Sequence, residues 1–162
     1  AWMRGGTYFV HRKIRTHVES WSATSLDSQE AIIGRFKDSG APLTGTHEED
    51  RPNLSAVDTS GAYIIPAGSH IRVAAPSSNG GEKILRRGYG FADGVDPRTG
   101  EFVAGLHFIC FQKNPVGQYV AIQKNVSMND FLSSYLTHVG SVIAAMPRGL
   151  RPGQGWGDQL FN

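Results

Sequence analysis

The most regular alternation of apolar and polar positions runs over residues 7–18 and predicts a β-strand. Tyr8, Val10 and Ile14 alternate there with positions that are mostly basic. The basic side chains would suit a phosphate-binding ribbon, but few aromatic rings accompany them for stacking on bases. We therefore expect a half-exposed strand with a solvated basic face. The basic residues of this strand are His11, Arg12, Lys13, Arg15 and His17.

Two further strands are predicted in the second half of the chain. Residues 104–112 place Leu106, Phe108 and Cys110 on one strand face, and the side chains on the other face are also largely apolar. A strand that is apolar on both faces is expected at the centre of a sheet. Residues 83–89 predict a shorter strand, and the stretch rich in Gly, Asp and Pro that follows it is expected to form turns.

Two helices are predicted from start signals and periodicity. Asp27, with Glu30 three positions later, has the pattern of a capping box, and Gly34 weakens the helix that follows. A second helix is predicted over residues 128–139, where apolar side chains recur at i, i+3, i+4 and i+7 and Gly140 provides a stop. Its apolar stripe comprises Met128, Phe131, Leu132, Tyr135, Leu136 and Val139, and its capping box pairs Ser127 with Asp130.

Between these elements lies a long segment without periodicity. Residues 38–64 are rich in Gly, Pro, Ser, Thr and Asp, so we expect a functional or disordered loop outside the core. His47 precedes an acidic run that ends at Asp50, which would suit a metal site, although a solvated charge run is the favoured interpretation. Residues 148–162 show little regular signal and are expected to form an irregular tail.

Composition limits the class of protein without identifying it. A chain of 162 residues with 40% hydrophobic and 19% charged residues fits one globular domain. The net charge of +2 gives no requirement for nucleic acid or a membrane surface. The single cysteine, Cys110, cannot form an intrachain disulfide. Because the chain opens on Ala1 without an initiator methionine or a signal peptide, we expect a processed product or a fragment.

One histidine stands in a context that could carry chemistry. His70 lies between proline-bounded turns, and Arg86 follows it by sixteen positions. A neutral imidazole is a common ligand of haem iron, and a fixed guanidinium can stabilise charge on an oxygen ligand. From spacing alone, however, a partly buried histidine bonded to a backbone carbonyl is the simpler interpretation, because no such spacing is diagnostic for haem.

Seven short blocks change that balance because they occur in one order along the chain. They are residues 5–8, 29–30 with 33–37, 40–43, 69–72, 84–89, 105–108 and 140–141. Together they resemble the C-terminal half of a dye-decolourising peroxidase, over about residues 4–147. The long insert between Arg35 and His70 resembles the branch of that family that is usually exported by the twin-arginine route.

The resemblance also implies a fold. The predicted order of strand, helix, loop, strand, strand and helix fits the α+β class. The family fold implies a ferredoxin-like antiparallel sheet with helices, one half of a two-domain dye-decolourising peroxidase. Residues 1–162 would then be the C-terminal haem-binding half, with 38–64 as an insert and 148–162 as a tail. A lone half is expected to leave the apolar strand face that carries Leu106 open to water.

On the proximal side of a haem, the resemblance implies that His70 is the axial ligand of the iron. Asp130 matches the acidic residue that bonds the other ring nitrogen of the ligand, which raises the basicity of the imidazole. The alternative for Asp130 is the capping box, and one carboxylate is not expected to serve both purposes. His107 is a fallback ligand, although it should point away from the face of Leu106 and Phe108.

On the distal side, Arg86 matches the arginine that stabilises the leaving oxygen during cleavage of peroxide. Arg87 is expected to be a surface or structural residue. Leu106 and Phe108 match apolar residues that shield the iron-bound oxygen, with ordinary core packing as the alternative. Arg35 matches a position that pairs with a haem propionate, and the alternative is an arginine that meets the dipole at a helix end.

The family's distal aspartate sits in a Gly-x-x-Asp-Gly motif, which residues 90–94 also spell. In the family, that motif precedes the proximal histidine and belongs to the other half of the protein. We therefore expect Asp93 to lie in a turn and to be non-catalytic. The distal acid would come from an N-terminal half, supplied by a cleaved precursor or by a separate chain.

The function implied is that of a haem peroxidase that uses hydrogen peroxide to oxidise dyes or phenolic compounds through an oxo-iron intermediate. The expected cofactor is haem b, and the expected location is secreted or periplasmic. Expected partners are the N-terminal half, hydrogen peroxide, an aromatic reductant and a further copy in a homo-oligomer, with no nucleic acid and no membrane. The alternatives are a haem-binding or iron-releasing protein with little turnover and a haem-free ferredoxin-like interaction domain.

Overall fold

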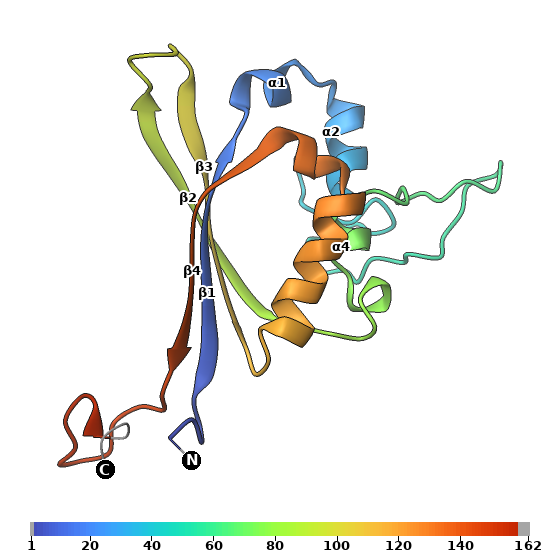
Figure 1. The fold of residues 1–162 in the computed structure, drawn as a ribbon. Coiled ribbons are helices and arrows are strands. Elements are labelled where there is room, and N and C mark those ends of the chain that lie inside the picture. Colours follow the sequence, from blue (N-terminus) through green and yellow to red (C-terminus); the bar gives the residue numbers. More distant parts are fainter. Residues whose placement is uncertain (1, 159–162) are drawn as a thin grey trace.

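The computed structural model describes residues 2–158, which form a four-stranded antiparallel sheet with helices on one side (Figure 1). The strand order is β2-β3-β1-β4. This order and the βαββαβ sequence of elements are those of a ferredoxin-like fold, so the α+β prediction is confirmed. The elements are β1 (Thr7–Thr16), α1 (Val18–Ala23), α2 (Leu26–Ile33), α3 (His70–Val73), η1 (Pro76–Ser78), β2 (Leu85–Val95), β3 (Phe102–Gln112), η2 (Val116–Val120), α4 (Ala121–Asn129), η3 (Phe131–Tyr135) and β4 (Leu136–Met146).

The helices cover one face of this sheet, here called the covered face. It carries Val10 of β1 and Cys110 of β3, both fully buried, which pack with Tyr119 of η2. The ring of Phe108 lies 6.0 Å from the ring of Tyr119. The expectation that this strand face would be open to water is wrong for Cys110, which is fully buried. It holds in part elsewhere, because Leu106 and Phe108 are only half-buried and Ile143 of β4, which pairs with Val10 on the same face, is 51% exposed.

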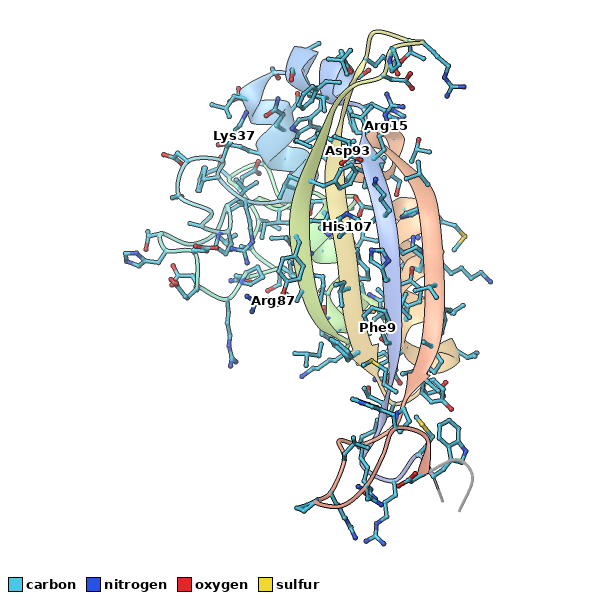
Figure 2. The ribbon with its side chains drawn as sticks, turned by 90° about the vertical axis from the view of Figure 1, so that its left-hand side faces the viewer. Phe9, Arg15, Lys37, Arg87, Asp93 and His107 are labelled. Atoms are coloured by element: carbon cyan, nitrogen blue, oxygen red, sulfur yellow. The ribbon has the colours of Figure 1, made fainter. Side chains whose placement is uncertain are left out.

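The opposite face of the sheet, here called the open face, carries no helix within residues 2–158. Figure 2 shows Phe9 and His107 projecting from it toward the viewer. His11 Nε2 lies 2.9 Å from His107 Nδ1, and the two rings are stacked. An ion pair of 2.7 Å between Lys13 and Asp93 crosses the same face. Aromatic and charged side chains thus share the surface that the helices leave uncovered.

The basic residues of β1 do not form one solvated face, as the sequence had led us to expect. His11, Lys13 and Arg15 lie on the open face, whereas Arg12 shares the covered face with Val10. Strand geometry explains the division, because successive side chains point to opposite sides. The strand is also central and ends at Thr16, two residues before the predicted limit.

β2 is longer than predicted. The stretch over residues 90–97 was expected to form turns, but β2 continues to Val95 and pairs with β3 along its length. A register shift between Ala92 and Gly94 accommodates the turn-forming residues without ending the strand. Asp93 therefore lies in a bulged strand and not in a turn.

The predicted helix over residues 128–139 is wrong. α4 ends at Asn129, because Asp130 adopts an extended backbone with φ −89° and ψ 119°. The chain then forms the short 3₁₀ helix η3 and the edge strand β4. The apolar stripe thus crosses three elements of different type. Val142 and Ile143 in the following stretch are β-branched residues that favour a strand.

The first predicted helix is present with a different cap. The side chain of Ser25 accepts a hydrogen bond from the backbone N–H of Ser28, whereas Asp27 lies in the first turn of α2. Gly34 ends the helix with φ 89°. That left-handed conformation favours glycine, so Gly34 stops the helix rather than weakening its interior.

The long segment between α2 and α3 contains no regular helix or strand and projects from the helical layer (Figure 1). Its first part nevertheless belongs to the core, which the sequence did not predict. Ala41 is 1% exposed, and Pro42, which forms an isolated β-bridge with Arg35, is also buried. Ile65, at the far end of the segment, is fully buried as well. No helix within residues 2–158 is long and apolar enough to cross a lipid bilayer.

The close contact between β1 and β3 gives a test of this packing. A Cβ at Gly105 would lie 1.9 Å from the carbonyl oxygen of Ile14. Gly105→Ala should therefore lower the free energy of unfolding by about 2 kcal/mol or more, because a backbone atom must move. Gly90→Ala on β2 is the matched control, since its Cβ would meet only the oxygen of Gly105, at 4.0 Å. Urea unfolding that showed equal losses for both variants would contradict the described register.

Candidate functional site

The turn before α3 positions His70. The backbone N–H and the hydroxyl of Ser69 both donate to the carbonyl of Pro66, at 3.1 and 2.9 Å. Arg72 fixes the same turn by donating to the carbonyl of Ile65 through Nε and Nη2, at 3.0 and 2.6 Å. Its guanidinium also stacks on the ring of Tyr63. His70 thus begins a helix whose approach is held by several independent hydrogen bonds.

Close packing brings this turn against η3. A Cβ at Gly68 would overlap the ring of Phe131, so glycine lets the ring pack in this position. The backbone N–H of Phe131 donates to the carbonyl of Gly68 at 2.9 Å. Because Phe131 follows Asp130 directly, this contact places Asp130 beside His70, although sixty positions separate the two residues in the sequence.

Asp130 and His70 form a short hydrogen bond. Nδ1 of His70 lies 2.5 Å from Oδ2 of Asp130, whose side chain is 1% exposed, while that of His70 is 30% exposed. The other carboxylate oxygen, Oδ1, accepts from the backbone N–H of Leu132 at 2.8 Å. The expectation that one carboxylate could not serve both purposes is therefore wrong, because each oxygen has its own partner.

This bond determines which nitrogen of His70 is available. Since Nδ1 faces a carboxylate, it carries the proton in the neutral ring, and Nε2 then keeps a lone pair. Within residues 2–158, Nε2 makes no hydrogen bond. A histidine held by a carboxylate at one nitrogen and free at the other has the arrangement of a metal-ligating imidazole.

The covered face of the sheet carries the predicted distal residues. Arg86 pairs directly with Cys110, and Gly88 pairs with Phe108. Directly paired residues point to the same side of a sheet, so Arg86, Leu106 and Phe108 all face the helical layer that carries His70. Arg86 is exposed and makes no hydrogen bond or ion pair within residues 2–158.

The neighbouring arginine points to the other side of the sheet. Nε of Arg87 donates to the hydroxyl of Tyr89 at 2.9 Å, and the guanidinium lies 5.6 Å from the centre of the same ring. Figure 2 shows Arg87 on the open face. The prediction that Arg87 is a surface residue agrees with this position, and the two arginines cannot exchange roles without a shift of register.

Arg35 does not take the alternative role predicted for it at the end of α2. Its Nη1 donates to the carbonyls of Gly40 and Glu48, at 2.6 and 2.9 Å. These groups belong to the long loop and not to the last turn of α2, so Arg35 holds the loop rather than meeting the helix dipole. Its proposed contact with a propionate stays a prediction.

A cleft of about 460 Å³ lies between α2 and η3, beside the turn that holds His70. Its floor includes Phe131, which packs on Gly68, and Pro66 also lines it. The remaining lining residues are Thr24, Ser28, Ala31, Ile32, Ser134 and Tyr135. The lining is mostly apolar, with four hydroxyl groups from the serine, threonine and tyrosine residues.

Comparisons with known proteins decide the family. A family model described as "Dyp-type peroxidase, C-terminal" matches residues 1–151. The chain belongs to the Dyp-type peroxidase family. It is 37% identical to a dye-decolorizing peroxidase of Thermobifida fusca over 162 residues, covering 99% of this chain and 37% of that protein. It is also 37% identical to a deferrochelatase of Escherichia coli K12 over 142 residues, covering 86% of this chain and 33% of that protein.

Solved structures agree with this assignment. Ferric DtpA from Streptomyces lividans superposes with a TM-score of 0.93 at 37% identity, covering 99% of this chain and 44% of that one. A DyP-type peroxidase from Cellulomonas bogoriensis gives a TM-score of 0.92 at 35% identity, with the same coverage of 99% and 44%. The chain therefore spans less than half the length of the relatives that it matches.

Asp93 and His107 of this Dyp-type domain lie away from the covered face. Asp93 is on the open face, in its ion pair with Lys13, which agrees with the expectation that its motif is not the catalytic copy. His107 is on the same face, bonded to His11, so it points away from Leu106 and Phe108 as predicted. No cluster of three or more metal-ligating side chains occurs among the residues that the structure describes, including the surroundings of His47.

The thiol of this Dyp-type domain has no nucleophilic character. Burial raises the pKa of Cys110 to about 11, and its Sγ lies 3.1 Å from Oε1 of Gln112. Thiolate chemistry needs the opposite shift of the pKa. Cys110 is therefore a packing residue.

One charged residue of the covered face was missed in the sequence. Arg12 was grouped with the other basic residues of β1, although its position two residues from Val10 and from Ile14 places it on the apolar side of the strand. The alternation itself was the signal that could have found it. Its guanidinium lies 5.7 Å from the centre of the Tyr119 ring, inside the molecule.

Proposed function

We propose that this chain is the haem-binding half of a dye-decolourising peroxidase, and that His70 is the ligand of the iron. The observation that carries the proposal is the hydrogen bond from Nδ1 of His70 to the buried carboxylate of Asp130, which leaves Nε2 available. That arrangement raises the basicity of a ligating imidazole. Bound haem b would supply the redox chemistry, in which hydrogen peroxide oxidises dyes or phenolic compounds by way of an oxo-iron state.

The donor set and the shape of the covered face fit a haem. His70 offers one nitrogen ligand, and no thiolate competes with it because Cys110 is buried and protonated. On the covered face of β2, an added Cβ at Gly90 would meet no atom nearer than 4.0 Å, which leaves room there for a flat ligand, whereas the side chain of Leu106 fills the space at Gly88. Leu106 and Phe108 would form the apolar part of this surface and exclude water from the reacting oxygen.

Arg86 is proposed to stabilise negative charge on the oxygen that leaves during cleavage of peroxide. Its guanidinium has no counter-ion within residues 2–158, and it lies on the covered face. A guanidinium beside the reacting oxygen would stabilise the negative charge that develops on it. Arg87, which faces the other way and bonds Tyr89, cannot do this.

The rest of the active site is proposed to come from an N-terminal half. Within the described residues, the covered face offers an arginine but no acidic partner for it, and Asp93 lies on the opposite face. A companion carrying a Gly-x-x-Asp-Gly motif would supply the distal acid. The body of such a companion would bury the open face, with Phe9, His11 and His107, and its Gly-x-x-Asp-Gly segment would pass the edge strand β2 to reach Arg86 on the covered face. We further propose that the protein is exported from the cytoplasm, that it takes electrons from an aromatic reductant, and that it assembles into a homo-oligomer.

A second candidate function is haem binding with release of iron and little turnover. The observation that favours it is the identity of 37–39% to several proteins named deferrochelatase. Both functions use the same ligand, so they are separated by turnover and not by haem content. Peroxide-dependent oxidation of a dye supports the peroxidase, whereas loss of iron from an intact porphyrin supports the alternative.

The ligand assignment predicts the behaviour of a His70→Ala variant. In the protein that joins this chain to its N-terminal companion, affinity for haem should fall by about 100-fold or more, since even the partners of a ligand contribute 10–100-fold. His47→Ala, in the exposed loop, is the control and should keep the wild-type visible spectrum. An unchanged Soret band in the His70 variant would contradict the assignment of His70 as the ligand of the iron.

The two arginines of β2 should differ in kinetics. Arg86→Leu should keep haem and slow the reaction with hydrogen peroxide by about 10²–10³-fold, as expected for loss of a charge-stabilising donor. Arg87→Leu should change that rate by much less, because its side chain lies on the open face. Stopped-flow measurements would contradict the proposal if Arg87→Leu were the slower variant.

A further inference from the structure

Arg12 is a charged residue inside the covered face without an acidic partner. It occupies the central strand β1 and pairs with Phe108 of β3 and with Ser141 of β4. Its Nε is buried and has no hydrogen-bond partner. No ion pair involves Arg12 among the residues that the structure describes.

A buried guanidinium without a counter-ion is unfavourable, since removing a charge from water costs several kcal/mol unless another group replaces the lost hydration. Tyr119 replaces this hydration only in part: the centre of its ring lies 5.7 Å from the guanidinium and its hydroxyl accepts a hydrogen bond from Arg12, but the tyrosine carries no negative charge. Arg12 as a whole is half-buried, so part of the residue reaches accessible space on the covered face. Within residues 2–158, the packing thus gives Arg12 a neutral neighbour in Tyr119 but no counter-ion.

The charge of Arg12 acts on its neighbours. Desolvation lowers the pKa of His138, and the positive charge of Arg12 lowers it further. Burial raises the pKa of Tyr119, and Arg12 opposes that rise. Both neighbours therefore experience a positive potential on the same face that carries Arg86.

We propose that Arg12 binds a carboxylate of the ligand held between the sheet and the helices, namely a propionate of the haem. A guanidinium presents several N–H donors in one plane, which match the two oxygens of a carboxylate. Arg12 shares the covered face with Arg86, Leu106 and Phe108, and it lies directly beside Phe108. This inference rests on the proposed function, because it requires haem at that face.

A purely structural role makes a different prediction. If Arg12 only packs on Tyr119, then removing it weakens the protein whatever ligand is bound. If it binds a propionate, then its effect depends on the charge of the ligand's carboxylates. The dimethyl ester of haemin keeps the ring and the iron but lacks both charges, so it separates the two roles.

The experiment measures dissociation constants of haemin and haemin dimethyl ester in the protein that joins this chain to its N-terminal companion. Wild type should bind haemin more tightly than the ester. Arg12→Leu should weaken haemin binding by about tenfold or more and leave ester binding unchanged, as expected for a charge-assisted contact. Arg15→Leu is the control, because Arg15 lies on the open face in a 2.7 Å ion pair with Glu101, and it should not change the ratio.

Arg12→Gln provides a second variant that keeps much of the stem over Tyr119, and it should show the same selective loss. Equal weakening of both ligands, or no weakening of either, would overturn the inference while leaving the proposed function intact. Failure of wild type to bind haemin at all would overturn the proposed function and this inference together.

Discussion

The hydrogen bond between His70 and Asp130 is the interaction on which the proposed site depends. It joins two elements that are sixty residues apart, and the buried carboxylate serves a second purpose by capping η3 through Leu132. The cap and the imidazole use different oxygens of Asp130, so the carboxylate holds both partners at once. Glycine at residue 68 lets the ring of Phe131 pack directly on this turn, since an added Cβ would overlap the ring.

The alternation of side chains along each strand is a second constraint, because it decides which face of the sheet each residue occupies. Because successive side chains alternate in direction, Arg86 and Arg87 face opposite sides, and so do Arg12 and its neighbour Lys13. The covered face thereby collects arginines and apolar residues opposite His70. The open face collects stacked histidines and paired charges, which suits contact with another protein surface. Under the proposed function, one face of this four-stranded sheet would bind the haem and the other would contact the N-terminal companion.

Much of this arrangement was predictable from the sequence, and the failures have identifiable causes. Alternation predicted β1 and β3, and the order of the blocks indicated the family and the pairing of His70 with Asp130. The helix over residues 128–139 failed because its apolar stripe has helical spacing while it crosses a helix end, a 3₁₀ turn and a strand. The fourth strand was missed for the same reason. Arg12 was missed because the basic residues of β1 were judged by composition and not by strand face.

The central claim is that Asp130 acts on iron through His70, and one measurement tests it most directly. Resonance Raman spectroscopy of the ferrous protein, joined to its N-terminal companion, reports the stretching frequency of the bond between iron and imidazole. Asp130→Asn retains an oxygen that can cap η3 but removes the charge beside Nδ1, so we expect a lower frequency than in wild type and a similar free energy of unfolding. An unchanged frequency with a lower free energy of unfolding would contradict the account and leave Asp130 as a helix cap alone.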